Sequence, residues 1–83
     1  MNTPTMRAKF VVSQVIKHEG GSEKVNFNAV AKSGAYPADG SDEDNTFAKW
    51  TPSAQCSIQI TNPALQGKFE EGQKFYVDFT PAQ

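Results

Sequence analysis

The stretch AQCSIQIT, residues 54–61, alternates apolar and polar side chains over its whole length. Ala54, Cys56, Ile58 and Ile60 occupy every second position, and polar residues separate them. A period of two residues is typical of a β-strand with one face toward a core and the other toward water. This stretch therefore predicts a half-buried strand, and the segments on either side are interpreted from it.

Two segments toward the N-terminus carry the same period. Residues 7–17 are rich in β-forming side chains, but the alternation fails at Ser13 and Gln14, where a β-bulge would return Val15 to the core side. Paired glycines in residues 18–23 predict a tight turn, because glycine adopts the positive φ values of hairpin turns without strain. Residues 24–32 then alternate again, so we expect an antiparallel hairpin.

Toward the C-terminus, the segment NPALQG at residues 62–67 combines an N-cap asparagine, a proline and a closing glycine. This pattern predicts one helical turn, in which Leu65 would plug an open end of the sheet. A last strand is expected where Phe75, Val77 and Phe79 alternate with polar neighbours. A short edge strand or an extended segment is expected at residues 46–50, limited by Pro52, and would bring the total to about five strands. We therefore expect an all-β fold, a small antiparallel barrel or sandwich of the OB or SH3-like type.

Length and composition favour one small domain. A chain of 83 residues has room for a single core, and 37% hydrophobic residues with six Phe suffice to build it without metals or disulfides. Residues 1–5 are polar and contain a proline, so we expect a flexible arm followed by one β domain at residues 6–83, with Met6 as an alternative start. The sequence has no signal-peptide pattern and no apolar run of about 18 residues, so a soluble protein is expected.

The chemistry-bearing residues do not favour catalysis. Cys56 and His18 are the only residues of their kinds and could form a nucleophilic dyad. Cys56, however, lies on the core side of its predicted strand, and a buried structural thiol is the favoured interpretation; one cysteine also excludes an intramolecular disulfide and fits a reducing compartment. No phosphate loop, metal cluster or paired catalytic carboxylates are present. We therefore expect no enzyme activity and no cofactor.

A long loop at residues 33–45 carries four carboxylates. The carboxylates suggest a calcium site, because hard cations need several oxygen ligands, but Asp44 stands where an EF-hand loop needs glycine and Trp50 where it needs glutamate. A solvated acidic loop is favoured over a weak ion site or a surface for a basic partner. Trp and Tyr are favoured interface anchors, and aromatic residues flank the loop. The predicted contacts here are Tyr36, Asp39, Asp42, Glu43, Asp44, Phe47 and Trp50.

The first hairpin should carry basic residues on its outer face. We predict that three of these basic residues, Arg7, Lys9 and Lys24, contact a partner. Residues 1–36 hold five basic and two acidic side chains, whereas residues 37–83 hold three and seven. This balance does not suggest a dedicated nucleic-acid binder, and the outward positions between the basic residues are Val11, Asn26, Asn28 and Val30 rather than aromatic stacking platforms.

Four segments resemble those of small uncharacterised proteins encoded by tailed bacteriophages. They are MRAKFVV at residues 6–12, EDNTFAK at 43–49, NPAL at 62–65 and FYVDFTPA at 75–82. The resemblance spans most of residues 6–82, and its motifs are structural, so it carries no catalytic residues over. The leader before Met6 departs from the usual start.

The resemblance implies a phage protein, and the leading hypothesis is a non-catalytic virion component of the capsid decoration or cement type. The expected partner is a phage capsid or host protein, a homo-oligomer is a further option, and no membrane is involved. One alternative is a soluble inhibitor of a host defence or nucleic-acid enzyme that uses the acidic loop as a phosphate mimic. Another is an accessory protein that binds single-stranded nucleic acid. The expected location is the virion or the host bacterial cytoplasm.

Overall fold

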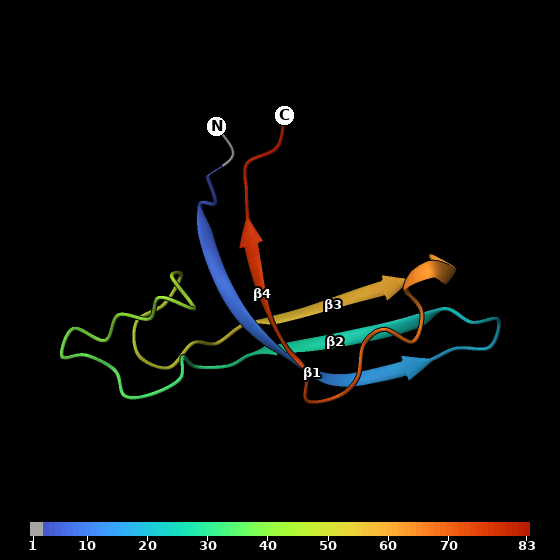
Figure 1. The fold of residues 1–83 in the computed structure, drawn as a ribbon, viewed down its shortest axis with the longest axis horizontal. Coiled ribbons are helices and arrows are strands. Elements are labelled where there is room, and N and C mark those ends of the chain that lie inside the picture. Colours follow the sequence, from blue (N-terminus) through green and yellow to red (C-terminus); the bar gives the residue numbers. More distant parts are fainter. Residues whose placement is uncertain (1–2) are drawn as a thin grey trace.

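The structure, a computed structural model, describes residues 3–83 as one antiparallel sheet with a single helical turn. The strands lie in the order β3-β2-β1-β4 (Figure 1). The predicted all-β antiparallel class and the one helical turn are confirmed. The elements in chain order are β1 Met6–Lys17, β2 Glu23–Ala29, β3 Gln55–Ile60, the 3₁₀ turn η1 Pro63–Leu65 and β4 Lys74–Phe79.

The sheet is open, so of the expected barrel or sandwich the barrel does not form. β1 pairs with β4 over residues 6–11 and with β2 over residues 10–17, so its two halves belong to different parts of the sheet. In Figure 1 β1 curves, and the two parts form a short limb (β4 with residues 6–11) and a long limb (β2, β3 and the rest of β1). The predicted bulge lies between Val12 and Gln14, and it adds to this bend.

The predicted edge strand at residues 46–50 does not form among residues 3–83, which hold four strands. Residues 41 and 49 meet only through an isolated bridge between Ser41 and Lys49. The backbone of Trp50 adopts a φ of 62°, a left-handed conformation that a strand cannot contain. Among the described residues no further strand pairs with the edge strands β3 and β4, so the sheet does not close.

The apolar residues predicted to face the core do share one side of the sheet. Ala8, Phe10 and Val12 of β1, Val25 and Phe27 of β2, and Ile60 of β3 are buried there. The bulge works as predicted, because Val15 pairs with Val25 while Gln14 pairs with Asn26 on the polar side. Phe69, from the segment between η1 and β4, packs edge-on against Phe27 with ring centroids 6.0 Å apart. This segment covers only part of the apolar side.

Local turn chemistry agrees with the sequence. Gly20 and Gly21 have φ values of 93° and 103°, as the tight turn between β1 and β2 requires. The Asn62 side chain accepts a hydrogen bond from the Ala64 backbone N–H at 3.0 Å and so caps η1. Leu65, however, is half exposed, so it does not plug the sheet as predicted.

The predicted flexible arm at residues 1–5 includes residues 1–2, which lie outside the described residues. Thr5, at its other end, donates its backbone N–H to the carbonyl of Phe79 at 2.7 Å. This bond extends the β1–β4 ladder beyond Met6, so the last residue of the predicted arm is attached to the sheet.

Candidate functional site

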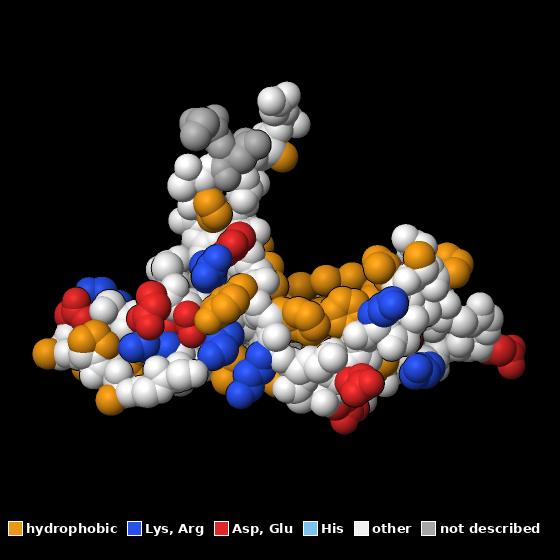
Figure 2. Space-filling view, viewed as in Figure 1, with side chains coloured by type: hydrophobic (Ala, Val, Ile, Leu, Met, Phe, Trp, Pro, Cys, Tyr) orange, Lys and Arg blue, Asp and Glu red, His pale blue; other side chains and the backbone are white. Residues whose placement is uncertain are grey.

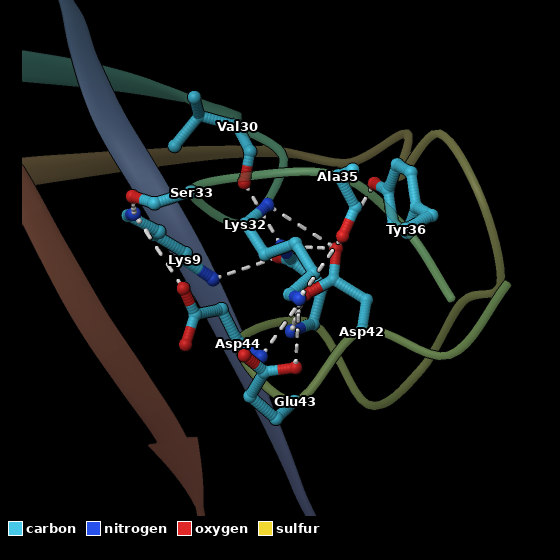
Figure 3. A network of polar contacts seen from close by, with 10 residues as sticks. Lys9, Val30, Lys32, Ser33, Ala35, Tyr36, Asp42, Glu43 and Asp44 are labelled. Atoms are coloured by element: carbon cyan, nitrogen blue, oxygen red, sulfur yellow. Dashed lines mark hydrogen bonds and ion pairs between the residues drawn. The ribbon is translucent and has the colours of Figure 1, made fainter.

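The long loop is organised around the carboxylate of Asp42, which is only 3% exposed. Its Oδ1 accepts the backbone N–H groups of Asp44 and Asn45 at 3.0 and 3.1 Å, the pattern of an Asx turn. Its Oδ2 accepts the Tyr36 hydroxyl at 3.1 Å and the Asn45 amide at 3.2 Å (Figure 3). The prediction of a fully solvated acidic loop is therefore wrong for Asp42.

Burial and hydrogen bonds shift the pKa values of three loop residues, Asp42, Tyr36 and Asp39. Burial raises the pKa of Asp42, but hydrogen bonds from Asn45, Tyr36 and the backbone outweigh burial and hold that pKa below its ordinary value. Burial and the bond to Asp42 raise the pKa of Tyr36. At the loop surface, the Ser41 N–H and hydroxyl lower the pKa of Asp39. The network thus favours an ionised Asp42 and a neutral Tyr36.

Asn45 attaches the loop to the sheet. It is fully buried, its Oδ1 accepts the Lys9 backbone N–H at 2.8 Å, and its Nδ2 donates to the Val30 carbonyl at 2.9 Å. Thr46 exchanges hydrogen bonds with both backbone groups of Arg7 at 2.9 Å. Asn45 and Thr46 thus form hydrogen bonds with backbone groups of Lys9 and Arg7 on the edge of β1 that faces away from β4. At these two residues β2 does not pair with β1. The sequence analysis did not single out Asn45 or Thr46, although an asparagine after an aspartate-rich turn is a capping signal.

Two of the four loop carboxylates are paired with basic groups of the same chain. Lys9 Nζ lies 3.5 Å from Asp44, with both side chains mostly buried, and Lys32 Nζ lies 3.4 Å from Glu43 (Figure 3). Within residues 3–83, no group of three or more His, Cys, Asp or Glu side chains is gathered as a metal site would require. The loop therefore presents less free negative charge than its sequence implies.

Trp50 and Tyr36 form an aromatic pair on the surface of the loop. Their ring centroids lie 5.9 Å apart, and Trp50 is 51% exposed. Gly40 makes this arrangement possible: its φ is 75°, its carbonyl accepts the Trp50 N–H at 2.7 Å, and a Cβ at this position would overlap the indole ring. Phe47 does not join the pair but packs against the core.

The basic outer face is divided rather than continuous. Arg7 makes a two-pronged ion pair with Asp78 at 2.7 and 3.0 Å, which lowers the pKa of Asp78. The Arg7 guanidinium also lies 4.6 Å above the ring of Tyr76. An aromatic residue is thus present on this face, contrary to the sequence analysis, because β4 places Tyr76 beside Lys9. Arg7 already occupies that ring, and Lys24 lies apart on β2.

The largest unexpected feature is the uncovered part of the apolar side. Figure 2 shows apolar side chains gathered in the inner corner between the two limbs. Four large apolar residues of the sheet and of η1 are exposed, namely Ile58 at 47%, Leu65 at 48%, Phe75 at 36% and Phe79 at 46%. A cleft of ≈ 270 Å³ continues this surface, lined by apolar residues that include Met6, Phe47 and Cys56. We call Ile58, Leu65, Phe75 and Phe79 the apolar patch. Alternation placed Ile58, Phe75 and Phe79 on the core side, but only the tertiary structure shows that the described chain leaves them partly exposed, Phe75 despite its contacts with Phe27 and Phe69.

Cys56 and His18 are not brought together by the sheet. Cys56 pairs with Phe27, whereas His18 follows Lys17, which pairs with Glu23. Four residues along β2 separate these pairs by roughly 13 Å. The register therefore keeps the thiol and the imidazole beyond hydrogen-bond distance.

Within the described residues no helix is long and apolar enough to cross a membrane. Comparison of the chain with protein-family models, with curated proteins and with solved structures finds no match in any of the three.

Proposed function

We propose that this chain is a non-catalytic structural protein that acts by protein–protein association, as a capsid decoration or cement-type component of a phage virion. The observation that carries the proposal is the apolar patch, the part of the sheet's apolar side that residues 3–83 leave exposed. The resemblance of four segments to small phage proteins supplies the class of assembly.

The physical argument starts from the layers of the fold. A sheet that is apolar on one side is stable when a second layer covers that side. Here the segment carrying Phe69 covers part of it, and the inner corner stays open (Figure 2). Large contiguous apolar surface on a folded chain usually marks an interface. Another protein surface is therefore the natural complement of this chain.

A second surface suits contact with the capsid. Trp50 is half exposed on a loop that hydrogen bonds hold in shape, so it would contact a partner without a large loss of conformational entropy. The two alternative functions receive less support. Lys9 and Lys32 pair with two of the four loop carboxylates that a phosphate mimic would present, and Arg7 occupies the aromatic ring that a nucleobase would stack on.

The proposal is tested on purified particles of the phage that encodes the chain. Mass spectrometry should find the chain in many copies per particle, and its absence from the particles would exclude this function. Particles assembled with Trp50→Ala should retain less of the chain than the wild type. Tyr76→Ala is the matched control, because Tyr76 is equally exposed but lies on the polar side of β4.

A further inference from the structure

We propose that the apolar patch is covered by the same patch of a second copy, so that the chain is a two-fold symmetric dimer in solution. The inference rests on the proposed function in one respect, namely that the chain acts by association. It adds the identity of the first partner: the unit that joins a larger assembly is a pair of chains, and the loop carrying Trp50 stays free on each copy.

The chain exposes more surface than a compact monomer of its mass, as a protomer that buries one face against a partner does. A monomeric protein of 9.1 kDa is expected to expose about 4,900 Å² of surface. This chain exposes 5757 Å², because it is flat and elongated, with extents of 49 × 32 × 15 Å. The excess, summed over the whole chain, is about 850 Å², which is as large as the share of about 800 Å² that each partner buries in a standard interface.

The chemistry of the apolar patch permits self-association. Around a two-fold axis each side chain meets the same surface of the partner, so a charge near the axis would face a like charge. None of the four patch residues is ionisable, and homodimer interfaces are more apolar than other interfaces. Glu23 faces the same side at the far end of β2, but it is buried, accepts the Gly67 N–H at 3.1 Å and lies 3.8 Å from Lys17.

The bent shape of the sheet lets two copies interlock. Phe79 projects from the short limb, whereas Ile58 and Leu65 lie at the long limb and its end. The open corner between the limbs is visible in Figures 1 and 2. A two-fold rotation places the apolar side of each copy against the apolar side of the other, so that each copy supplies the second layer that the other lacks. Every copy meets an identical copy as it is synthesised, and no charge on the patch opposes that contact.

Sedimentation equilibrium of the full chain tests the dimer, with chain concentrations from about 1 to 100 µM spanning micromolar affinities. The expected mass is twice the 9.1 kDa of one chain. Ile58→Lys places two unpaired charges in the interface and should weaken the dimer by at least about 100-fold. The matched control is Gln59→Lys, which adds the same charge to the next residue of β3, on the polar side, and should sediment as the wild type does.

Circular dichroism shows whether each variant keeps the sheet. If Ile58→Lys does not fold, Phe79→Lys is measured instead, because Phe79 lies at the last position of an edge strand; Thr80→Lys, an exposed neighbour, is its control. Cys56 offers a second readout, since it lines the cleft beside the patch. Its reaction with a thiol reagent should slow as the wild-type concentration rises, and it should stay fast in the dissociated variant.

A wild type that sediments as a monomer at every concentration would overturn the dimer. A folded Ile58→Lys variant that dimerises as tightly as Gln59→Lys would do the same. Failure here is distinguishable from failure of the proposed function. A monomeric chain that is abundant in particles would leave the virion role intact and assign the patch to a capsid protein, whereas a dimer absent from particles would leave the interface intact without that role.

Discussion

Replacing Asn45 by alanine should destabilise the chain more than the loss of one polar side chain usually does. The Asn45 amide joins three groups from separate segments, the Lys9 N–H, the Val30 carbonyl and the Asp42 carboxylate. Alanine removes all three hydrogen bonds and supplies no replacement. Because Asn45 is fully buried, water cannot take its place without opening the loop.

The size of the effect follows from the groups left unpaired. Each buried backbone group without a partner costs about 1–3 kcal/mol, so two such groups, at Lys9 and Val30, give a loss of about 3 kcal/mol in the free energy of unfolding. For a domain of this size that loss corresponds to a fall in Tm of about 12–24 °C. It is a large share of the about 5–15 kcal/mol that stabilises a typical domain.

Urea unfolding at a fixed chain concentration measures the effect. Trp50, the only tryptophan, reports on the loop by fluorescence, and far-ultraviolet circular dichroism reports on the sheet. Asn28→Ala is the control, since Asn28 is exposed on β2, and it should change stability by less than about 0.5 kcal/mol. If Asn45→Ala changes stability no more than this control, the loop does not depend on the Asn45 hydrogen bonds.

Three further predictions concern the loop and the core. Gly40→Ala should displace the Trp50 ring, which would shift its fluorescence emission to the red and lower the free energy of unfolding by at least about 1–3 kcal/mol. Gly34→Ala is the control, because Gly34 has a similar φ but open space around it, and it should lower the free energy of unfolding by less. Equal effects of the two substitutions would contradict the packing argument. Burial raises the pKa of Asp42 but hydrogen bonds lower it further, so its folded-state pKa lies below the unfolded value of about 3.9. The stabilisation by the ionised Asp42 carboxylate is therefore full above that value and is lost as pH falls through the lower folded-state pKa. The difference in urea midpoint between the wild type and Asp42→Asn should shrink from pH 7 to about pH 2. A constant difference would refute the lowered pKa of Asp42. Phe10→Ala should cost about 3–5 kcal/mol in urea unfolding, since Phe10 is buried in the core cluster; a loss below about 1 kcal/mol would show that the cluster is loosely packed.

Alternation predicted most of the sheet because the sheet keeps one apolar side. Val25 and Phe27 lie inward and Asn26 outward as the period of two requires, and the failure of that period at Ser13 marked the bulge. The edge strand at residues 46–50 could not be judged in this way. Its apolar residues, Phe47 and Trp50, have separate roles: Phe47 packs against the core, while the Trp50 backbone turns back to Gly40.

The candidate site was only partly predictable. Residue type was enough to suggest Trp50 and Tyr36 as exposed anchors, but the same reasoning treated Asp42 as a solvated charge. Its burial depends on Tyr36 and Asn45 being folded against it, and no local pattern reports such a convergence. The pairing of Lys9 with Asp44 likewise joins residues 35 positions apart in the chain.

The sequence by itself determined that this chain is a small antiparallel β domain with one apolar side, because the period of two residues is a local property of each strand. Only the tertiary structure decided whether that side is covered. Contacts between distant segments set the strand order and the pairing of β4 with the first half of β1. They also make residues 46–50 a turn instead of a strand. Those contacts leave Ile58, Phe75 and Phe79 exposed, although their spacing is that of core residues.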